Sequence, residues 1–200
     1  GAAAMAAQAA GRTGAGLVSV ATRAEHVPAL LTRQPETMAR GVDTPEELDA
    51  LLERASVVVL GPGLGQDAWG RALWQKVMAT ALPRVLDADA LNLLAADENA
   101  AAFRHQVLTP HPGEAARLLA VTTAEVQRDR FGAARAIAAR FNAVVVLKGV
   151  GSLIASPGGR VGVCPFGNPA MATAGMGDAL TGIIGSLVGQ GVELFDTACA

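Results

Sequence analysis

Short apolar runs alternate along this chain with segments whose apolar residues recur at helical spacing. Val57–Leu60 and Ala143–Leu147 are continuous apolar runs, the pattern of a strand that is covered on both faces. A helical pattern follows most of these runs, so that strands and helices come in turn. This alternation predicts an α/β layered fold, in which helices flank a mostly parallel central sheet.

Helix starts and turns set the limits of the predicted elements. Thr44 caps a helix that has Pro45 in its first turn, and Thr122 forms a capping box with Glu125 at another start. The segment Pro157–Gly159 predicts a hairpin turn. The remaining predictions are helices over 2–12, 66–80, 122–141 and from 178 onward, strands over 17–20, 85–86 and 107–108, and hairpin strands over 152–155 and 160–163.

The composition fits a single folded domain over residues 1–200. Hydrophobic residues make up 51% of the 200 residues and charged residues 17%, so the chain has enough apolar surface for a core. The formal net charge of −2 lacks the basic excess of a nucleic-acid-binding protein, and no such partner is expected. A small anionic ligand stays compatible with this charge, because backbone dipoles bind phosphate without net positive charge.

Several features predict a cytoplasmic protein with no membrane contact. No stretch approaches the ~18 uninterrupted apolar residues of a membrane helix, and the alanine-rich start lacks the basic lead of a signal peptide. Cys164 and Cys199 are far apart in the sequence and in no metal-binding spacing, as expected of thiols in a reducing compartment.

The turn Gly175–Gly177 is followed by Asp178 at a predicted helix start. Two glycines let the backbone point successive N–H groups at one spot, where the helix dipole adds positive potential. Such a spot binds phosphate, and Asp178 beside it suits the removal of a proton from a hydroxyl aimed at that phosphate. A plain turn in which Asp178 only caps the helix fits the segment equally well.

Polar residues also follow the other predicted strands, at the sheet edge where α/β proteins bind their ligands. Asp87 and Asp89 suit a hydrated Mg²⁺, although Asp89 also suits a helix cap. His111 and Glu114 follow the next strand, and Lys148, which suits a phosphate, follows the most apolar one. A structural histidine and a solvated lysine are the plainer alternatives, yet so many polar loops at one edge favour an enzyme.

Five motifs stand here in the order found in NAD(P)H-hydrate dehydratases, and the chain resembles their ribokinase-like domain from end to end. The motifs are Gly61-Pro62-Gly63-Leu64-Gly65, Asp87-Ala88-Asp89-Ala90-Leu91, Pro110-His111-Pro112-Gly113-Glu114, Lys148-Gly149-Val150-Gly151-Ser152 and Gly167-Asn168-Pro169-Ala170-Met171-Ala172-Thr173. Each motif alone is weak, whereas the combination is specific. The resemblance implies a ribokinase-like layered α/β fold.

The resemblance also implies a metabolite-repair activity. Enzymes of this family are hydro-lyases that return hydrated NADH or NADPH to the reduced cofactor, with ADP or ATP consumed and Mg²⁺ present. The implied course is phosphorylation of the ring hydroxyl, followed by loss of phosphate. An NAD(P)H-hydrate epimerase is the implied functional partner, and a homo-oligomer is the implied assembly.

Match to the family motifs implies a role for each site residue. Asp178 would be the catalytic base, Gly175 and Gly177 would form the anion hole, and Glu114 would hold the metal through water. The residues that would line the hydrated-cofactor site are Ala2, Gly63, His111 and Asp178. The residues that would hold the nucleotide are Lys148, Gly149, Val150, Gly151, Ser152 and Gly177.

The chain departs from the family pattern in its motifs and at its ends. Ala170 and Ala174 stand where the family usually has glycine, and Met176 stands where it has threonine or serine, which removes a hydroxyl beside the expected phosphate site. The chain also resembles a piece of the family domain that lacks the first strand and the last helix, and no epimerase domain is expected within residues 1–200.

Two other functions stay open on the sequence. A ribokinase-like kinase for a vitamin precursor or a sugar alcohol would have the same anion hole, although the motifs at His111–Glu114 and Gly167–Pro169 favour the dehydratase. A catalytically impaired nucleotide-binding module is the second alternative, and Met176 is its main support.

Overall fold

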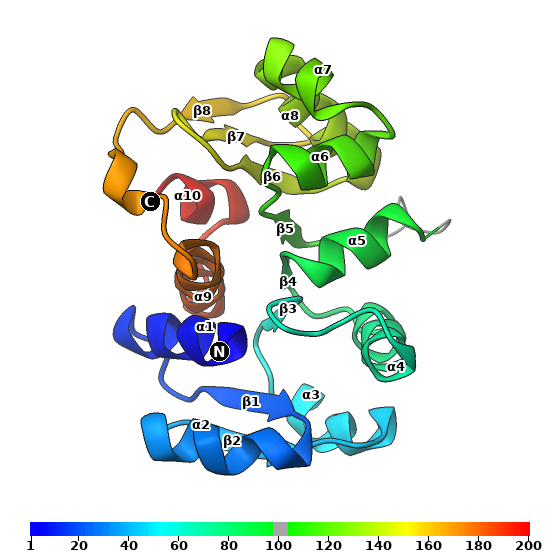
Figure 1. Ribbon diagram of the computed structural model, residues 1–200, viewed down its shortest axis with the longest axis vertical. Helices are drawn as coiled ribbons and strands as arrows, with labels where there is room; N and C mark the ends of the chain where they lie inside the picture. The colour runs from blue at the N-terminus through cyan, green and yellow to red at the C-terminus, as the bar shows by residue number, and fades with distance from the viewer. Residues whose placement is uncertain (98–103) are drawn as a thin grey trace.

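A six-stranded sheet forms the middle of the computed structural model, which describes residues 1–97 and 104–200 (Figure 1). Its strands stand side by side in chain order: β3 (Val58–Leu60), β4 (Arg84–Leu86), β5 (Gln106–Leu108), β6 (Val144–Leu147), β7 (Leu153–Ala155) and β8 (Val161–Val163). Neighbours from β3 to β6 pair in parallel, whereas β7 pairs antiparallel with β6 and with β8. The prediction of a mostly parallel sheet with a terminal hairpin is confirmed.

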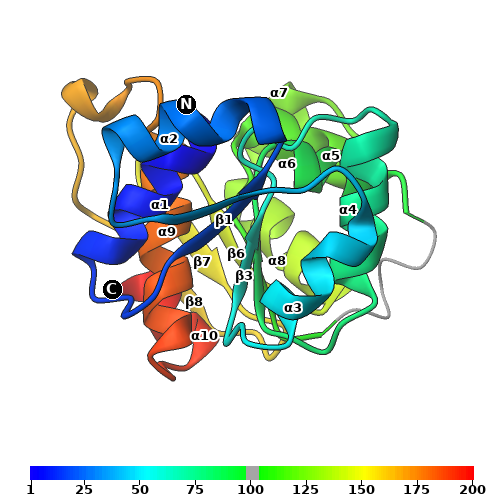
Figure 2. The same cartoon turned by 90° about the horizontal axis from the view of Figure 1, so that it is seen from below.

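Helices cover both faces of this sheet, so the fold has three layers (Figures 1 and 2). One side carries α1 (Ala2–Arg12), α9 (Met176–Gly189) and α10 (Leu194–Cys199), and the other carries α4 (Ala68–Met78), α5 (Asp89–Ala95), α6 (Pro112–Leu119) and α8 (Arg130–Phe141). Because both faces are covered, Val85, Val107 and Leu147 are completely buried. Within the ranges described, no helix is long and apolar enough to span a bilayer.

A second, two-stranded parallel sheet lies beyond β3 (Figure 1). It consists of β1 (Ser19–Thr22) and β2 (Met38–Gly41), with η1 (Ala24–His26) and α2 (Val27–Arg33) between them. Gln34, only 1% exposed, donates from Nε2 to the carbonyl oxygen of Ala4 at 2.9 Å and so ties this sheet to α1. The sequence placed the first strand two residues early and missed β2, because Met38–Gly41 is largely exposed and has no apolar run.

The predicted helix over 122–141 is wrong as a single element. It consists of α7 (Thr123–Arg128) and α8, which are separated at Asp129. The Asp129 carboxylate accepts the backbone N–H of Gly132 at 2.8 Å and caps α8, while the predicted capping box at Thr122 opens α7. The helical spacing of apolar residues continues across this break, so the sequence pattern did not predict it. The break places Arg130 in the first turn of α8.

The helix predicted after Thr44 begins there, and its shape differs from a regular helix. Glu47 accepts the backbone N–H of Thr44 at 3.2 Å, as the capping box requires. The segment that follows is a 3-10 turn, η2 (Pro45–Leu48), and one turn of helix, α3 (Asp49–Leu52). A further 3-10 turn, η4 (Pro169–Met171), precedes α9.

Helices α1 and α9 touch through their backbones. A Cβ atom at Gly182 would lie 2.1 Å from the carbonyl oxygen of Ala6, so only glycine fits at this crossing. Ala4 and Ala7 are buried on the same helix. Small residues therefore bring the start of α1 close to the start of α9, where Asp178 lies.

We predict that Gly182→Ala lowers the free energy of unfolding by about 1–3 kcal/mol, because the added methyl group must push α1 away from α9. The matched control is Gly11→Ala in α1, where a Cβ atom would meet nothing within 4 Å. That control gains up to about 1 kcal/mol from helix propensity. Urea unfolding of both variants checks the difference, and equal midpoints would contradict the close contact.

Candidate functional site

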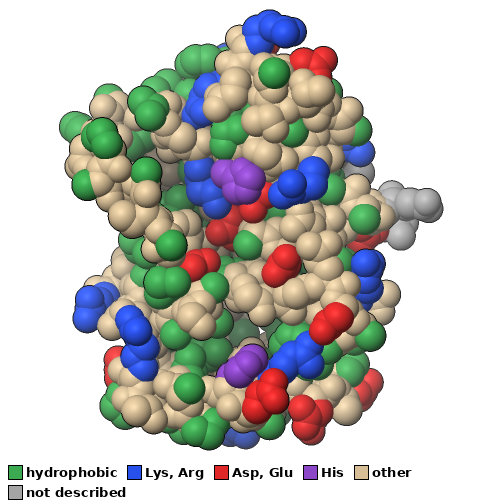
Figure 3. Space-filling view, in the orientation of Figure 1, with side chains coloured by type: hydrophobic (Ala, Val, Ile, Leu, Met, Phe, Trp, Pro, Cys, Tyr) green, Lys and Arg blue, Asp and Glu red, His purple; other side chains and the backbone are tan. Residues whose placement is uncertain are grey.

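The expected site residues gather where the parallel strands end. Asp87 follows β4 directly, His111 lies just after β5, Lys148 follows β6, and Asp178 lies in the first turn of α9. Figure 3 shows acidic, basic and histidine side chains together near the middle of this face. The prediction that polar residues distant in the sequence meet at this edge of the sheet is confirmed for Asp87, Glu114 and Lys148.

The start of α9 has the glycine backbone expected of an anion site. Gly175 precedes the helix with φ +90°, and a Cβ atom there would lie 2.3 Å from Sδ of Met5 in α1. A Cβ atom at Gly177 would lie 3.3 Å from Nζ of Lys148. Because the first N–H groups of a helix have no partner inside it, this turn presents donors beside a cation. Met176 is 40% exposed, so much of the side chain that departs from the family pattern lies in solvent.

A buried ion pair supports this turn. Asp87 is 2% exposed, and its Oδ1 lies 2.7 Å from Nζ of Lys148, which is also 3.9 Å from Oε2 of Glu114. The second oxygen of Asp87 lies 3.0 Å from the hydroxyl of Thr181. The plainer prediction of a freely solvated lysine is wrong, because 21% of the Lys148 side chain is exposed and its ammonium group is paired.

The surroundings of Asp178 suit a catalytic base. Burial raises the pKa of Asp178 above its ordinary value, the nearby charge of Asp87 raises it further, and Lys148 opposes both. A carboxylate whose pKa moves toward neutrality accepts a proton more readily than an ordinary one.

Glu114 and His111 hold each other at the start of α6. Glu114 accepts the backbone N–H of His111 at 2.7 Å, and Nδ1 of His111 accepts the backbone N–H of Gly113 at 3.0 Å. This reciprocal capping supports a structural role for the histidine. Even so, 52% of the His111 side chain is exposed, so its ring can meet a ligand as well.

Magnesium fits this edge as an ion held through water. Among the described residues, no three His, Cys, Asp or Glu side chains lie close enough to hold a metal directly. The carboxylates of Asp178 and Glu114 are hard oxygen ligands, and Mg²⁺ commonly binds through one or two such groups, water and nucleotide phosphates. Asp89 holds the glycine loop, because it accepts the N–H of Gly65 at 2.9 Å and Nε2 of Gln66 at 3.3 Å.

The glycine loop after β3 meets the start of α1. A Cβ atom at Gly61 would lie 1.8 Å from the carbonyl oxygen of Asp87, so the loop passes directly over that strand end. A Cβ atom at Gly63 would lie 3.8 Å from that of Ala2. Two of the residues expected around the hydrated cofactor are therefore neighbours.

The expected nucleotide loop projects from the end of β6. Gly149 and Gly151 have φ angles of +145° and +63°, and Val150 is fully exposed. The hydroxyl of Ser152 donates to the carbonyl oxygen of Gly149 at 3.0 Å. Arg130 holds the loop by donating from Nη2 to the carbonyl oxygens of Leu147 and Gly151, each at 3.3 Å. No sequence pattern pointed to Arg130, because it lies inside a helical pattern and far from the motif.

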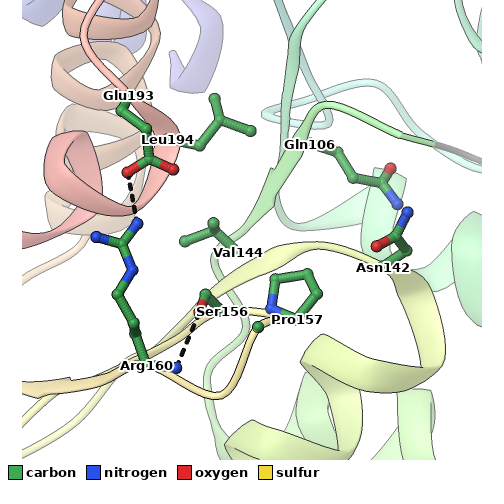
Figure 4. A pocket seen from close by; sticks show the side chains of 9 residues that line it. Gln106, Asn142, Val144, Ser156, Pro157, Arg160, Glu193 and Leu194 are labelled. Carbon is green, nitrogen blue, oxygen red and sulfur yellow. Dashed lines mark hydrogen bonds and ion pairs between the residues drawn. The ribbon is translucent and has the colours of Figure 1, made fainter.

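A cavity of about 550 Å³ lies elsewhere, at the amino ends of β5 and β6 (Figure 4). Gln106, Val144 and Ser156 line it, and Arg160 closes one side through its ion pair with Glu193 at 2.8 Å. It contains none of the residues expected in the site. The candidate site lies at the opposite edge of the sheet, where the loops after the parallel strands meet.

The whole chain, residues 1–200, matches the family model described as NAD(P)H-hydrate dehydratase. The chain belongs to the NAD(P)H-hydrate dehydratase family. It is 54% identical over 200 residues to the bifunctional NAD(P)H-hydrate repair enzyme Nnr of Coxiella burnetii, which covers 100% of this chain and 41% of that relative. The chain thus spans less than half the length of that curated relative.

Solved structures of the family have the same fold. The Bacillus subtilis ADP/ATP-dependent NAD(P)H-hydrate dehydratase, co-crystallised with ATP and Mg²⁺, is 33% identical with a TM-score of 0.85, over 99% of this chain and 70% of that one. A ribokinase-like superfamily protein from Enterococcus faecalis is 29% identical with a TM-score of 0.88, over 98% of this chain and 70% of that one. The fold is ribokinase-like, as the sequence predicted.

We predict that Asp178→Asn stabilises the chain near neutral pH. The pKa of Asp178 is raised in the folded state, so its ionised form opposes folding above that pKa. This penalty disappears below the ordinary carboxylate pKa of about 3.9, where the proton is bound in both states. Thermal unfolding should therefore give a higher Tm for Asp178→Asn at about pH 7 and equal values near about pH 3.5.

The matched control is Asp43→Asn, because Asp43 lies on the exposed surface ahead of η2. Its Tm should follow that of the unchanged chain across the same pH series. A lower Tm for Asp178→Asn at every pH would show that Asp178 is a structural cap.

Proposed function

We propose that this chain dehydrates the hydrates of NADH and NADPH at the expense of ADP or ATP. The observation that carries the proposal is the glycine turn at the start of α9, where Gly177 faces Lys148 and the Asp178 carboxylate has a raised pKa. These groups supply what a phosphoryl transfer to a hydroxyl needs: donors for the phosphate, a cation and a base. The family membership of the chain supports the choice of substrate.

The proposed reaction has two steps. Asp178 takes the proton of the ring hydroxyl while that oxygen attacks the terminal phosphorus, and the nucleotide leaves one phosphate shorter. The new phosphate ester then breaks at its carbon–oxygen bond, phosphate leaves with the electron pair, and the adjacent ring carbon loses a proton to form the double bond. Phosphate is a far better leaving group than hydroxide, which is why the nucleotide is consumed.

The remaining site residues receive roles that agree with their positions. Gly175 and Gly177 form the anion hole; Ala2, Gly63 and His111 line the substrate site. The projecting loop holds the nucleotide through Lys148, Gly149, Val150, Gly151 and Ser152. Glu114 would hold Mg²⁺ through water.

The setting of the activity is also a proposal. The Coxiella relative is named as bifunctional, which supports an NAD(P)H-hydrate epimerase as the functional partner of this chain. We further propose that the chain works in the cytoplasm as a homo-oligomer.

We predict that the chain with ADP and Mg²⁺ restores NADH absorbance from hydrated NADH. Asp178→Asn should lower kcat/KM by roughly 10²–10³-fold, or about 2.7–4 kcal/mol, because one charge-handling group is lost. Its affinity for ADP, measured by calorimetry, should remain. Asp43→Asn on the exposed surface is the control and should restore NADH at the unchanged rate.

The alternatives give different results in the same assay. Accumulation of a phosphorylated product without recovery of NADH would identify a small-molecule kinase. Binding of ADP without any turnover would identify an impaired nucleotide-binding module, and either outcome contradicts the proposed activity.

A further inference from the structure

Thr181 connects the buried ion pair to the first turn of α9. Its side chain is completely buried one helical turn after Gly177. The hydroxyl oxygen lies 2.7 Å from the carbonyl oxygen of Gly177 and 3.0 Å from Oδ2 of Asp87. One hydroxyl proton is thus shared between a helix carbonyl and a buried carboxylate.

The contacts of Thr181 continue through Asp87 to Lys148. Oδ1 of Asp87 holds Nζ of Lys148 at 2.7 Å, and that nitrogen lies 3.3 Å from the position of a Cβ atom at Gly177. This series of contacts therefore starts and ends at the first turn of α9. It joins the ends of β4 and β6 to α9, which are far apart in the sequence.

We propose that Thr181 is a positioning residue, whose hydroxyl fixes the Asp87 carboxylate and through it the Lys148 ammonium group against the Gly177–Asp178 turn. It touches neither substrate nor nucleotide. Loss of the hydroxyl leaves one oxygen of a buried carboxylate without its donor, and the carboxylate turns to find another. Lys148 then moves away from the phosphate site.

Two observations favour positioning over packing alone. A buried threonine can satisfy its hydroxyl with the helix carbonyl, so the contact with Asp87 is additional to what the helix needs. Asp87 also acts on Asp178, whose pKa it raises. Among the described residues, the charged groups around this turn include Asp87 after β4, Lys148 after β6 and Glu114 at the start of α6.

The test compares Thr181→Val with Thr181→Ser. Valine keeps the shape and removes the hydroxyl, whereas serine keeps the hydroxyl and removes a methyl group. Rates of NADH recovery rest on the proposed function, and the expected loss of kcat for valine is roughly 10–100-fold, since small misplacements in an active site have effects of this size.

A second readout does not depend on turnover. Calorimetry with ADP and Mg²⁺ should give a Kd for Thr181→Val several-fold above that of the unchanged chain, because Lys148 is displaced, while Thr181→Ser stays within about twofold. If the unchanged chain binds ADP but never restores NADH, the proposed function fails and this comparison still tests Thr181.

Wild-type affinity and kcat in Thr181→Val would overturn the positioning role. Equal losses in the valine and serine variants would also overturn it, because they would point to the methyl group. If Thr181→Val does not fold, the test compares Thr181→Cys with Thr181→Ser. Both variants lack the methyl group, and the cysteine thiol is a weaker hydrogen-bond donor than the serine hydroxyl. The serine variant should then exceed the cysteine variant in affinity and in kcat.

Discussion

The ion pair between Asp87 and Lys148 is the contact on which the site depends. A carboxylate that is 2% exposed is strongly destabilising unless it is paired, so the ends of β4 and β6 must bring the two side chains together. With Lys148 held there, a cation lies beside the first turn of α9. The same carboxylate lies near Asp178. Burial is the largest cause of the raised pKa of Asp178, and the charge of Asp87 raises it further. One buried pair thus places a cation beside the proposed phosphate site and a second carboxylate near the proposed base.

The packing of α1 on α9 serves the same site from the other side. Gly182 lets the two helices meet at the backbone, and Met5 fills the space beside Gly175. The start of α1 then lies against the glycine loop, where Ala2 and Gly63 are neighbours. Small residues in these helices are therefore a requirement of the site as well as of the core.

Patterns between residues close in the sequence predicted most helices and strands of this molecule. The features that these patterns did not predict depend on contacts between residues far apart in the sequence. The apolar run before Lys148 and the capping box at Thr122 are local, and the rule that ligands bind at the carboxyl ends of parallel strands placed Asp87, Lys148 and Asp178 together. The roles of Arg130 and Thr181 depend on partners in other elements, so each residue resembles an ordinary helix position. By sequence alone Asp89 suits a metal or a helix cap, because a carboxylate does not reveal that it accepts the backbone N–H of Gly65 from a distant loop.

The affinity of Gly177→Ala for ADP and Mg²⁺ tests most directly whether the nucleotide phosphate lies between α9 and Lys148. The added methyl group would lie 3.3 Å from Nζ of Lys148, and alanine favours the helix, so the fold is retained while the phosphate space is filled. Calorimetry should give a Kd at least about tenfold higher, or ~1.4 kcal/mol, whereas Gly11→Ala should bind as the unchanged chain does. Unchanged affinity in Gly177→Ala would contradict a phosphate site at this turn.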